Sequence, residues 1–138
     1  MTSDKAFVRQ RFAIVEVRLK TDLERQERIQ LQREHRLLGK LLDEAAEGQV
    51  LRTLQAWRRY LGGAFAQYRQ AHRTEREVFD NWWRLPADQR ADTPKPESPS
   101  LGTEVTDRNG YVWIVDDRFL AMMDDLIARL RKWLENGD

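Results

Sequence analysis

The sequence predicts a mainly α-helical protein with long antiparallel helices or a small helical bundle, a proline-rich linker, and a carboxy-terminal β-hairpin plus helix. Three observations predict this fold class. Apolar residues recur at helical spacing over residues 50–82 and 119–133, all four prolines lie within residues 86–99, and an Asn-Gly pair separates two strand-like runs. The chain has 138 residues, which suits one domain or one compact domain with an attached arm.

The first segment allows two interpretations. A helical stripe predicts one long helix from about Ser3 to Glu47, through Val8, Phe12, Val15, Leu19 and Leu23. Alternation of apolar and charged residues instead predicts a strand over residues 11–20 and a helix from Asp22, with Thr21–Glu24 as its capping box. Charge pairs at i,i+4 spacing favour the helix, but the sequence leaves both structures open for residues 11–20.

The strongest pattern predicts a helix over residues 49–84, which completes a helical region over residues 1–84. Gly48 suits the end of the preceding helix. Steps of four and three residues then give ten positions of which nine are apolar, namely Val50, Leu54, Trp57, Leu61, Ala64, Tyr68, Ala71, Glu75, Val78 and Trp82. Gly62 and Gly63 interrupt this stripe and indicate either a bend or the close approach of another backbone.

Residues 85–101 are predicted to form a linker. Pro86 disfavours helical geometry at Leu85, and Pro94, Pro96 and Pro99 follow among polar residues. Such a composition favours extended polyproline II structure and cannot bury a core. The segment is therefore the best candidate boundary between the helical region and the hairpin and helix of residues 102–138.

The predicted hairpin pairs Thr103–Arg108 with Tyr111–Val115. Asn109-Gly110 suits a two-residue type I′ turn, although a longer loop that starts at Asp107 also fits. One face of the second strand carries Tyr111, Trp113 and Val115 and the other carries Val112 and Ile114, so both faces require covering. Asp116 is a candidate N-cap for the final helix, Gly137 can close it, and its apolar stripe is Phe119, Met123, Leu126, Leu130 and Trp133.

Composition excludes several classes of protein. The chain has no cysteine, which excludes disulfide scaffolds, Cys-ligated metals and thiol catalysis. No apolar run approaches the ~18 residues of a membrane helix. The amino terminus lacks the apolar stretch of a signal peptide, and we therefore expect a cytoplasmic protein without a membrane partner.

Enzymatic chemistry has little support, and we assign no catalytic, cofactor-binding or metal-binding residue. The sequence lacks a P-loop, a dinucleotide-binding glycine pattern and a His-Glu-x-x-His motif. His35 falls on an apolar helical stripe, where a packing role is expected. His72 lies among charged residues that are typical of a solvated helix face.

The aromatic residues point to protein–protein docking. Trp82 and Trp83 project about 100° apart on a helix, so they cannot both lie at the centre of one narrow seam. Tryptophan is enriched at interface hot spots. The sequence thus predicts a non-enzymatic adaptor or structural subunit that docks onto protein partners or onto copies of itself, through the candidate interface residues Trp57, Trp82, Trp83, Tyr111 and Trp113.

An arginine-rich surface supports an alternative function. Residues 49–90 contain eight arginines, no lysine and four acidic residues. Because arginine binds phosphate bidentately and stacks on bases, these residues suit RNA or single-stranded DNA. The alternative is a small nucleic-acid-binding subunit of a ribonucleoprotein or phage DNA-handling assembly, with candidate contacts at Arg58, Arg59, Arg69, Arg73 and Arg76.

Overall fold

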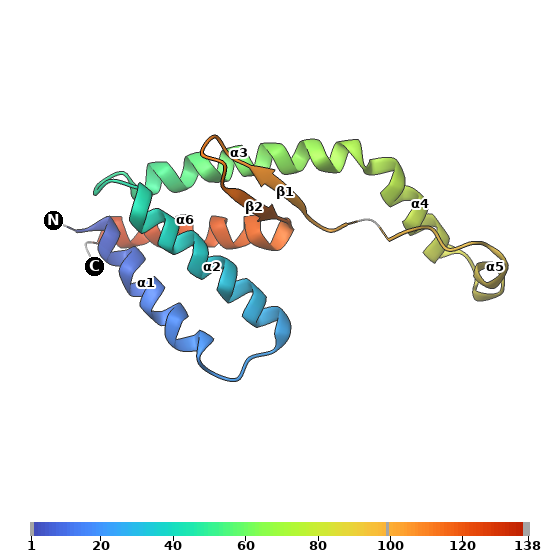
Figure 1. Ribbon diagram of the computed structural model, residues 1–138, viewed down its shortest axis with the longest axis horizontal. Coiled ribbons are helices and arrows are strands. Elements are labelled where there is room, and N and C mark those ends of the chain that lie inside the picture. The colour runs from blue at the N-terminus through green and yellow to red at the C-terminus, as the bar shows by residue number, and fades with distance from the viewer. Residues whose placement is uncertain (1, 99, 137–138) are drawn as a thin grey trace. The chain divides into compact units, whose positions relative to one another are not determined.

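A computed structural model describes residues 2–98 and 100–136 and confirms the predicted fold class (Figure 1). Within these residues the elements, in chain order, are α1 (Asp4–Leu19), α2 (Arg25–Glu44), α3 (Val50–Ala71), α4 (Arg73–Arg84), α5 (Ala87–Asp92), β1 (Thr103–Thr106), β2 (Val112–Val115) and α6 (Asp117–Asn136). The predictions for Pro99 and Gly137 fall outside the described residues. None of the described helices combines the length and apolar character that crossing a membrane requires.

The chain divides into two compact units. Met1–Tyr60 and Asp117–Asp138 form the first, here called the helical unit, and Leu61–Asp116 forms the second, here called the hairpin unit. One boundary falls inside α3 and the other directly before α6, whereas the sequence suggested a division at the linker of residues 85–101.

Helices α1, α2 and α6 build the core of the helical unit. Helix α1 packs along α2, and both helices contact α6 (Figure 1). The buried side chains come from every helical segment of this unit, including Val8 and Val15 of α1, Leu37, Leu38 and Leu41 of α2, Val50 and Leu54 of α3, and Met123, Leu126 and Leu130 of α6. The predicted stripe of the final helix is thereby confirmed up to Leu130.

Residues 11–19 are helical and Lys20 is the C-cap of α1, but the single long helix predicted up to Glu47 is wrong. The chain turns between α1 and α2, where the Thr21 hydroxyl donates to the Arg18 carbonyl at 2.6 Å and Arg28 Nη1 donates to the Leu19 carbonyl at 2.9 Å. These bonds satisfy carbonyls at the end of α1. Glu24 is the N-cap of α2 and makes no side-chain capping bond, so the predicted capping box is absent.

Asp4 joins the amino-terminal turns of two helices. Asp4 is 3% exposed, and its carboxylate accepts hydrogen bonds from the Lys5 N–H at 2.8 Å and the Val50 N–H at 3.0 Å. Burial by itself raises the pKa of Asp4, but backbone N–H groups of Gly48 and Val50 favour the charged form and hold the pKa below its ordinary value. Gly48 has a φ of +84°, a left-handed conformation that glycine adopts without strain.

Ser3 extends this junction to α6. Its side chain accepts from the Ala6 N–H, which caps α1, and donates to Glu47 at 2.7 Å. The Ser3 carbonyl accepts the Trp133 indole N–H at 3.0 Å, and the Trp133 ring lies 5.7 Å from that of Phe7. Two adjacent residues therefore connect α1, the start of α3 and the end of α6.

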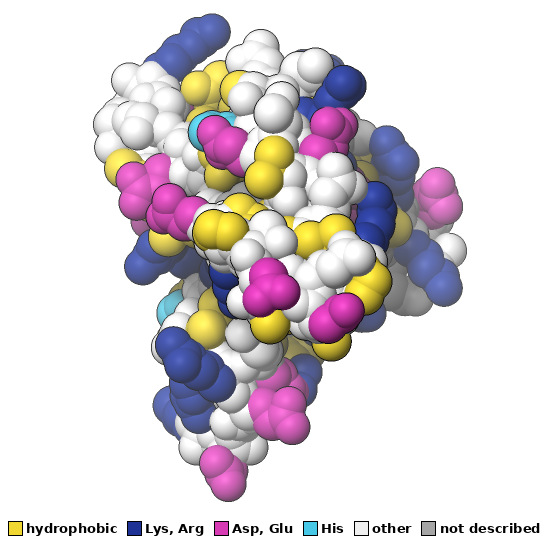
Figure 2. Space-filling view, turned by 90° about the vertical axis from the view of Figure 1, so that its right-hand side faces the viewer, with side chains coloured by type: hydrophobic (Ala, Val, Ile, Leu, Met, Phe, Trp, Pro, Cys, Tyr) yellow, Lys and Arg dark blue, Asp and Glu magenta, His cyan; other side chains and the backbone are white. Residues whose placement is uncertain are grey.

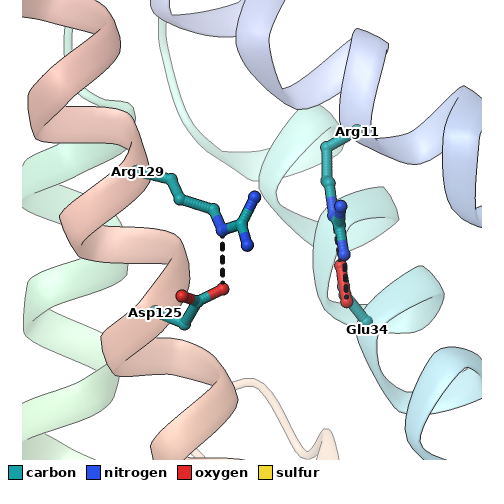
Figure 3. A network of polar contacts seen from close by, with 4 residues as sticks. All are labelled: Arg11, Glu34, Asp125 and Arg129. Carbon is teal, nitrogen blue, oxygen red and sulfur yellow. Dashed lines mark hydrogen bonds and ion pairs between the residues drawn. The ribbon is translucent and has the colours of Figure 1, made fainter. Parts of the chain in front are cut away.

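A charged pair lies at the interface of α1 and α2. Arg11 donates to both carboxylate oxygens of Glu34, at 2.7 and 3.2 Å, and Glu34 is 6% exposed. Figure 3 shows this pair beside Asp125 and Arg129 of α6, which are 2.8 Å apart. The hydrogen bond to Glu34, with the negative charges of Glu34 and Asp125, raises the pKa of Arg11 against the opposing effect of burial.

The helix predicted over residues 49–84 is interrupted at His72. The φ and ψ of His72 are −106° and 15°, and the His72 side chain contacts the Tyr68 ring and Glu75. Backbone hydrogen bonds still span the interruption, from the His72 N–H to the Tyr68 carbonyl and from the Arg76 N–H to the His72 carbonyl. Helix α3 runs through Gly62 and Gly63 without a break, and a Cβ at Gly63 would meet no atom within 4 Å.

The hairpin has the longer loop and not the two-residue type I′ turn. Strand β1 pairs with β2 in the antiparallel register Thr103↔Val115 to Thr106↔Val112. Asp107 Oδ1 accepts the N–H groups of Asn109 and Tyr111, and Gly110 takes the positive φ of +80°. Because the Asp107 side chain organises the loop, Asn109 needs no left-handed conformation.

Neutralising Asp4 is expected to destabilise the helical unit. The pKa of Asp4 is lower in the folded chain, so its stabilising contribution is complete above about pH 5 and is lost as the pH falls below about 4. Asp4→Asn should lower the free energy of unfolding at neutral pH by about 1–2 kcal/mol and flatten its decline in acid. Urea denaturation followed by circular dichroism measures both effects.

The matched control is Asp43→Asn, which neutralises an exposed carboxylate of α2 and should change stability by less than about 0.5 kcal/mol. Equal stability of Asp4→Asn and the wild type at neutral pH would contradict this role for Asp4.

Removing one partner of the Arg11–Glu34 pair is expected to lower the free energy of unfolding by more than removing both partners does. Glu34→Leu leaves the guanidinium without its carboxylate and should cost about 2 kcal/mol, less than in a fully buried pair because Arg11 keeps 23% exposure. The double variant Arg11→Leu/Glu34→Leu should recover most of this loss. Thermal and urea unfolding of the three chains provide the comparison, and a double variant less stable than Glu34→Leu would refute the expectation.

Candidate interaction site

Large hydrophobic side chains are exposed in the hairpin unit. Trp83 of α4 is 49% exposed, and Val112 and Ile114 on the outer face of β2 are 44% and 51% exposed. Val105, Trp113 and Val115 on the opposite face of the hairpin are buried. One face of the hairpin is therefore covered, while the other leaves Val112 and Ile114 in contact with solvent.

Helices α4 and α5 bury none of their residues, all of which are described. The predicted apolar stripe is buried at Val50, Leu54 and Leu61, but it ends in solvent at Val78, which is 52% exposed. The continuous seam predicted up to Trp82 is therefore wrong for α4. Periodicity identified an amphipathic helix there, but no other part of the described chain buries its apolar face.

Trp82 and Trp83 form a right-angled pair at the end of α4. Their ring centroids are 5.0 Å apart and their planes meet at 84°, an edge-to-face arrangement that aromatic quadrupoles favour. Phe79 contacts the Trp83 ring at 6.3 Å. Although the two tryptophans are adjacent on the helix, their rings are in contact with each other.

Two cationic side chains face both rings of this pair. Arg90 Cζ lies 5.9 Å from the Trp82 centroid and 5.3 Å from that of Trp83, and Lys95 Nζ lies 5.8 and 5.4 Å from the same centroids. Among the described residues no acceptor reaches the buried Arg90 Nε. The Trp82 indole N–H donates to the Thr93 carbonyl at 3.2 Å. Together these five residues form the Trp82–Trp83 site.

Sequence reasoning identified the two tryptophans of this site but missed the other three residues. Arg90, Thr93 and Lys95 all fall within the predicted linker of residues 85–101, and none of them is among the candidate interface residues. The available signal was the Pro94-Lys95-Pro96 sequence, which holds a cation in an extended segment close to the two tryptophans along the chain.

The other candidate interface residues occupy different environments. Trp57 belongs to the helical unit and is half-buried, with Lys40 Nζ 5.6 Å from its ring. Trp113 is 4% exposed, its indole N–H donates to Asp107 at 3.0 Å, and Tyr111 packs against it with ring centroids 4.9 Å apart. Of the predicted interface residues, Trp83 therefore presents the most accessible ring.

Most of the candidate nucleic-acid contacts are engaged by other side chains. Arg58 makes a two-pronged contact with Asp124 at 2.8 and 3.2 Å, Arg73 lies 3.3 Å from Glu77, and Arg76 lies 3.5 Å from Asp80. Arg69 stands over the Phe65 ring, and Arg59 is exposed. On the face drawn in Figure 2, basic and acidic side chains are interspersed.

The two histidines contact aromatic and acidic side chains. His35 stacks on Phe12 at 4.3 Å and lies 3.3 Å from Glu16, while His72 Nδ1 lies 2.8 Å from Glu75. The described residues contain no cluster of three or more His, Asp or Glu side chains placed to hold a metal ion. Comparison with models of known protein families, with curated proteins and with solved structures finds no match.

The backbone of α4 is expected to open more readily than that of α6. Helix α4 has no buried residue, whereas α6 contributes six buried side chains, and local stability follows the burial of apolar surface. Amide hydrogen exchange followed by mass spectrometry should show α4 exchanging at least about tenfold faster. Equal protection of the two helices would mean that α4 is covered in solution.

Proposed function

We propose that the chain is a non-enzymatic helical adaptor or structural subunit that docks onto protein partners or onto copies of itself within a larger complex. The observation that carries this proposal is the contrast within one chain between a well-buried core and exposed apolar side chains on the hairpin unit. When a partner removes valine, isoleucine and tryptophan side chains from water, the free energy of the system falls by roughly 25 cal/mol per Å² of apolar area buried.

The outer face of β2 is the docking surface that we assign first. Ile114 and Val112 pair across the hairpin with Glu104 and Thr106, so an apolar strip runs beside a polar one. This arrangement suits an interface with an apolar centre and a polar rim. The opposed net charges of residues 1–90 (+5) and 91–138 (−4) support orientation of a partner during encounter.

Nucleic-acid binding receives less support from the surface. A carboxylate beside an arginine offsets part of the positive charge that would attract phosphate. Arg58, Arg73 and Arg76 each have such a carboxylate within 3.5 Å. Protein docking therefore remains the preferred function, and nucleic-acid binding becomes one outcome of the test.

Val112→Thr/Ile114→Thr tests this surface, because threonine keeps the β-branched shape and removes apolar area. The full-length chain, tagged in its native host and purified with and without nuclease, should retain protein partners after nuclease treatment, and light scattering should detect association with itself. We expect the double variant to retain at least about tenfold less partner protein, or to show a self-association constant at least about tenfold lower, than the wild type.

The matched control is Ile14→Thr/Val17→Thr, which makes the same chemical change at exposed positions of α1. This control should bind as the wild type does. Retention that disappears with nuclease would favour the nucleic-acid alternative, and a chain that is strictly monomeric and captures no protein would refute the proposal.

A further inference from the structure

The Trp82–Trp83 site already holds an extended proline-containing segment of its own chain. Residues 94–98 belong to no helix or strand, and Thr93 is extended with a φ of −112° and a ψ of 130°. Pro94 and Pro96 fix their own φ angles near −65° and bias the residues that precede them, Thr93 and Lys95, toward extended geometry. The segment Thr93–Pro96 is thus extended at Thr93, and its two prolines restrict it toward the φ values of polyproline II.

The contacts that hold this segment are of a kind that recognises proline-rich peptides. The Trp82 indole N–H donates to a backbone carbonyl of the segment, that of Thr93, at 3.2 Å. Lys95 Nζ lies 5.4 Å from the Trp83 centroid and 5.8 Å from that of Trp82. Aromatic grooves that bind polyproline II ligands likewise receive a preformed extended backbone, and cation–π contacts add selectivity for Lys or Arg.

We propose that Trp82 and Trp83 form a recognition site for an extended segment of a partner protein with a Lys or Arg between prolines, and that Thr93–Pro96 occupies this site in cis. This proposal rests on the proposed function of protein docking and names the class of partner segment. The internal segment then acts as a competitor, which lowers the apparent affinity for a segment supplied in trans.

Several features favour exchange of the internal segment for an external one. Trp83 remains 49% exposed with the segment in place, and neither α4 nor α5 is anchored by a buried residue. Cation–π contacts at exposed sites are individually weak. The internal segment is therefore held by a few solvent-accessible contacts that a second segment can replace.

The surrounding charge suits a cationic ligand. Residues 73–98 carry six acidic and five basic side chains, and two of those basic side chains are Arg90 and Lys95 of the site itself. When Lys95 leaves the rings, the six acidic and four other basic side chains of residues 73–98 give a net charge of −2, which offsets the positive charge that Arg90 keeps at the rings. A polyanion such as RNA would gain no net attraction from the same surface.

The test opens the site and supplies the segment as a peptide. Pro94→Ser/Lys95→Ser/Pro96→Ser in the full chain removes the internal competitor and leaves both tryptophans in place. The probe is a synthetic peptide with two copies of Thr-Pro-Lys-Pro, and the readout is the shift of the indole N–H signals of Trp82 and Trp83 in NMR spectra. We expect the opened variant to bind at least about fivefold more tightly than the wild type.

Controls separate recognition from general charge attraction. A peptide with two copies of Thr-Ala-Lys-Ala keeps the charge and should bind at least about fivefold more weakly, because it lacks the preformed extended backbone. Trp83→Ala in the opened variant should abolish binding, whereas Val78→Ala, at an exposed position of the same helix, should not. Equal binding of the two peptides, or equal affinity of the opened variant and the wild type, would overturn the proposal.

Failure here remains distinguishable from failure of the proposed function. The Val112→Thr/Ile114→Thr experiment alters neither tryptophan, so a chain that keeps its hairpin-dependent partner but ignores the proline peptide refutes only the recognition site. A chain that binds the peptide and whose captured protein partner is retained equally by the Val112→Thr/Ile114→Thr variant refutes only the hairpin surface.

Discussion

The helical unit depends on one buried carboxylate. Asp4 lies in the first turn of α1 and accepts the N–H of Val50, which opens α3, so one anion stabilises the positive ends of two helix dipoles. The adjacent Ser3 binds Glu47 and, through its carbonyl, the Trp133 indole. These residues are up to 130 positions apart in sequence. The polar junction therefore determines which helices meet, while the leucines and valines between them supply the apolar contact area.

Specific polar pairs accompany the apolar packing elsewhere in this unit. The buried Glu34 needs Arg11, because a carboxylate removed from water without a partner is strongly unfavourable. The pair joins α1 to α2 at one register only, and Arg28 adds a second restraint through the carbonyls of Leu19 and Thr21.

The hairpin unit buries fewer of its side chains than the helical unit does. Among the residues of this unit that the structure describes, the buried ones are Leu61 and Phe65 at its start and those on one face of the hairpin. Helices α4 and α5 contribute exposed aromatic and charged side chains and no core. A chain that buries one region well and leaves another accessible has the distribution of surface that docking requires, and this contrast supports the proposed interaction function.

Local sequence patterns were enough to predict the elements that depend on neighbouring residues alone. Apolar periodicity identified the helices around Val50–Leu61 and Phe119–Leu130, and the Asn109-Gly110 pair located the hairpin, because these signals arise between residues close together in the chain. Tertiary structure decided what local pattern could not. The turn after α1, the partners of Asp4 and Glu34, and the exposure of α4 all depend on which distant groups supply hydrogen bonds and cover apolar faces. Residue spacing along the chain does not encode such distances, so the cationic members of the Trp82–Trp83 site emerged only from the folded chain.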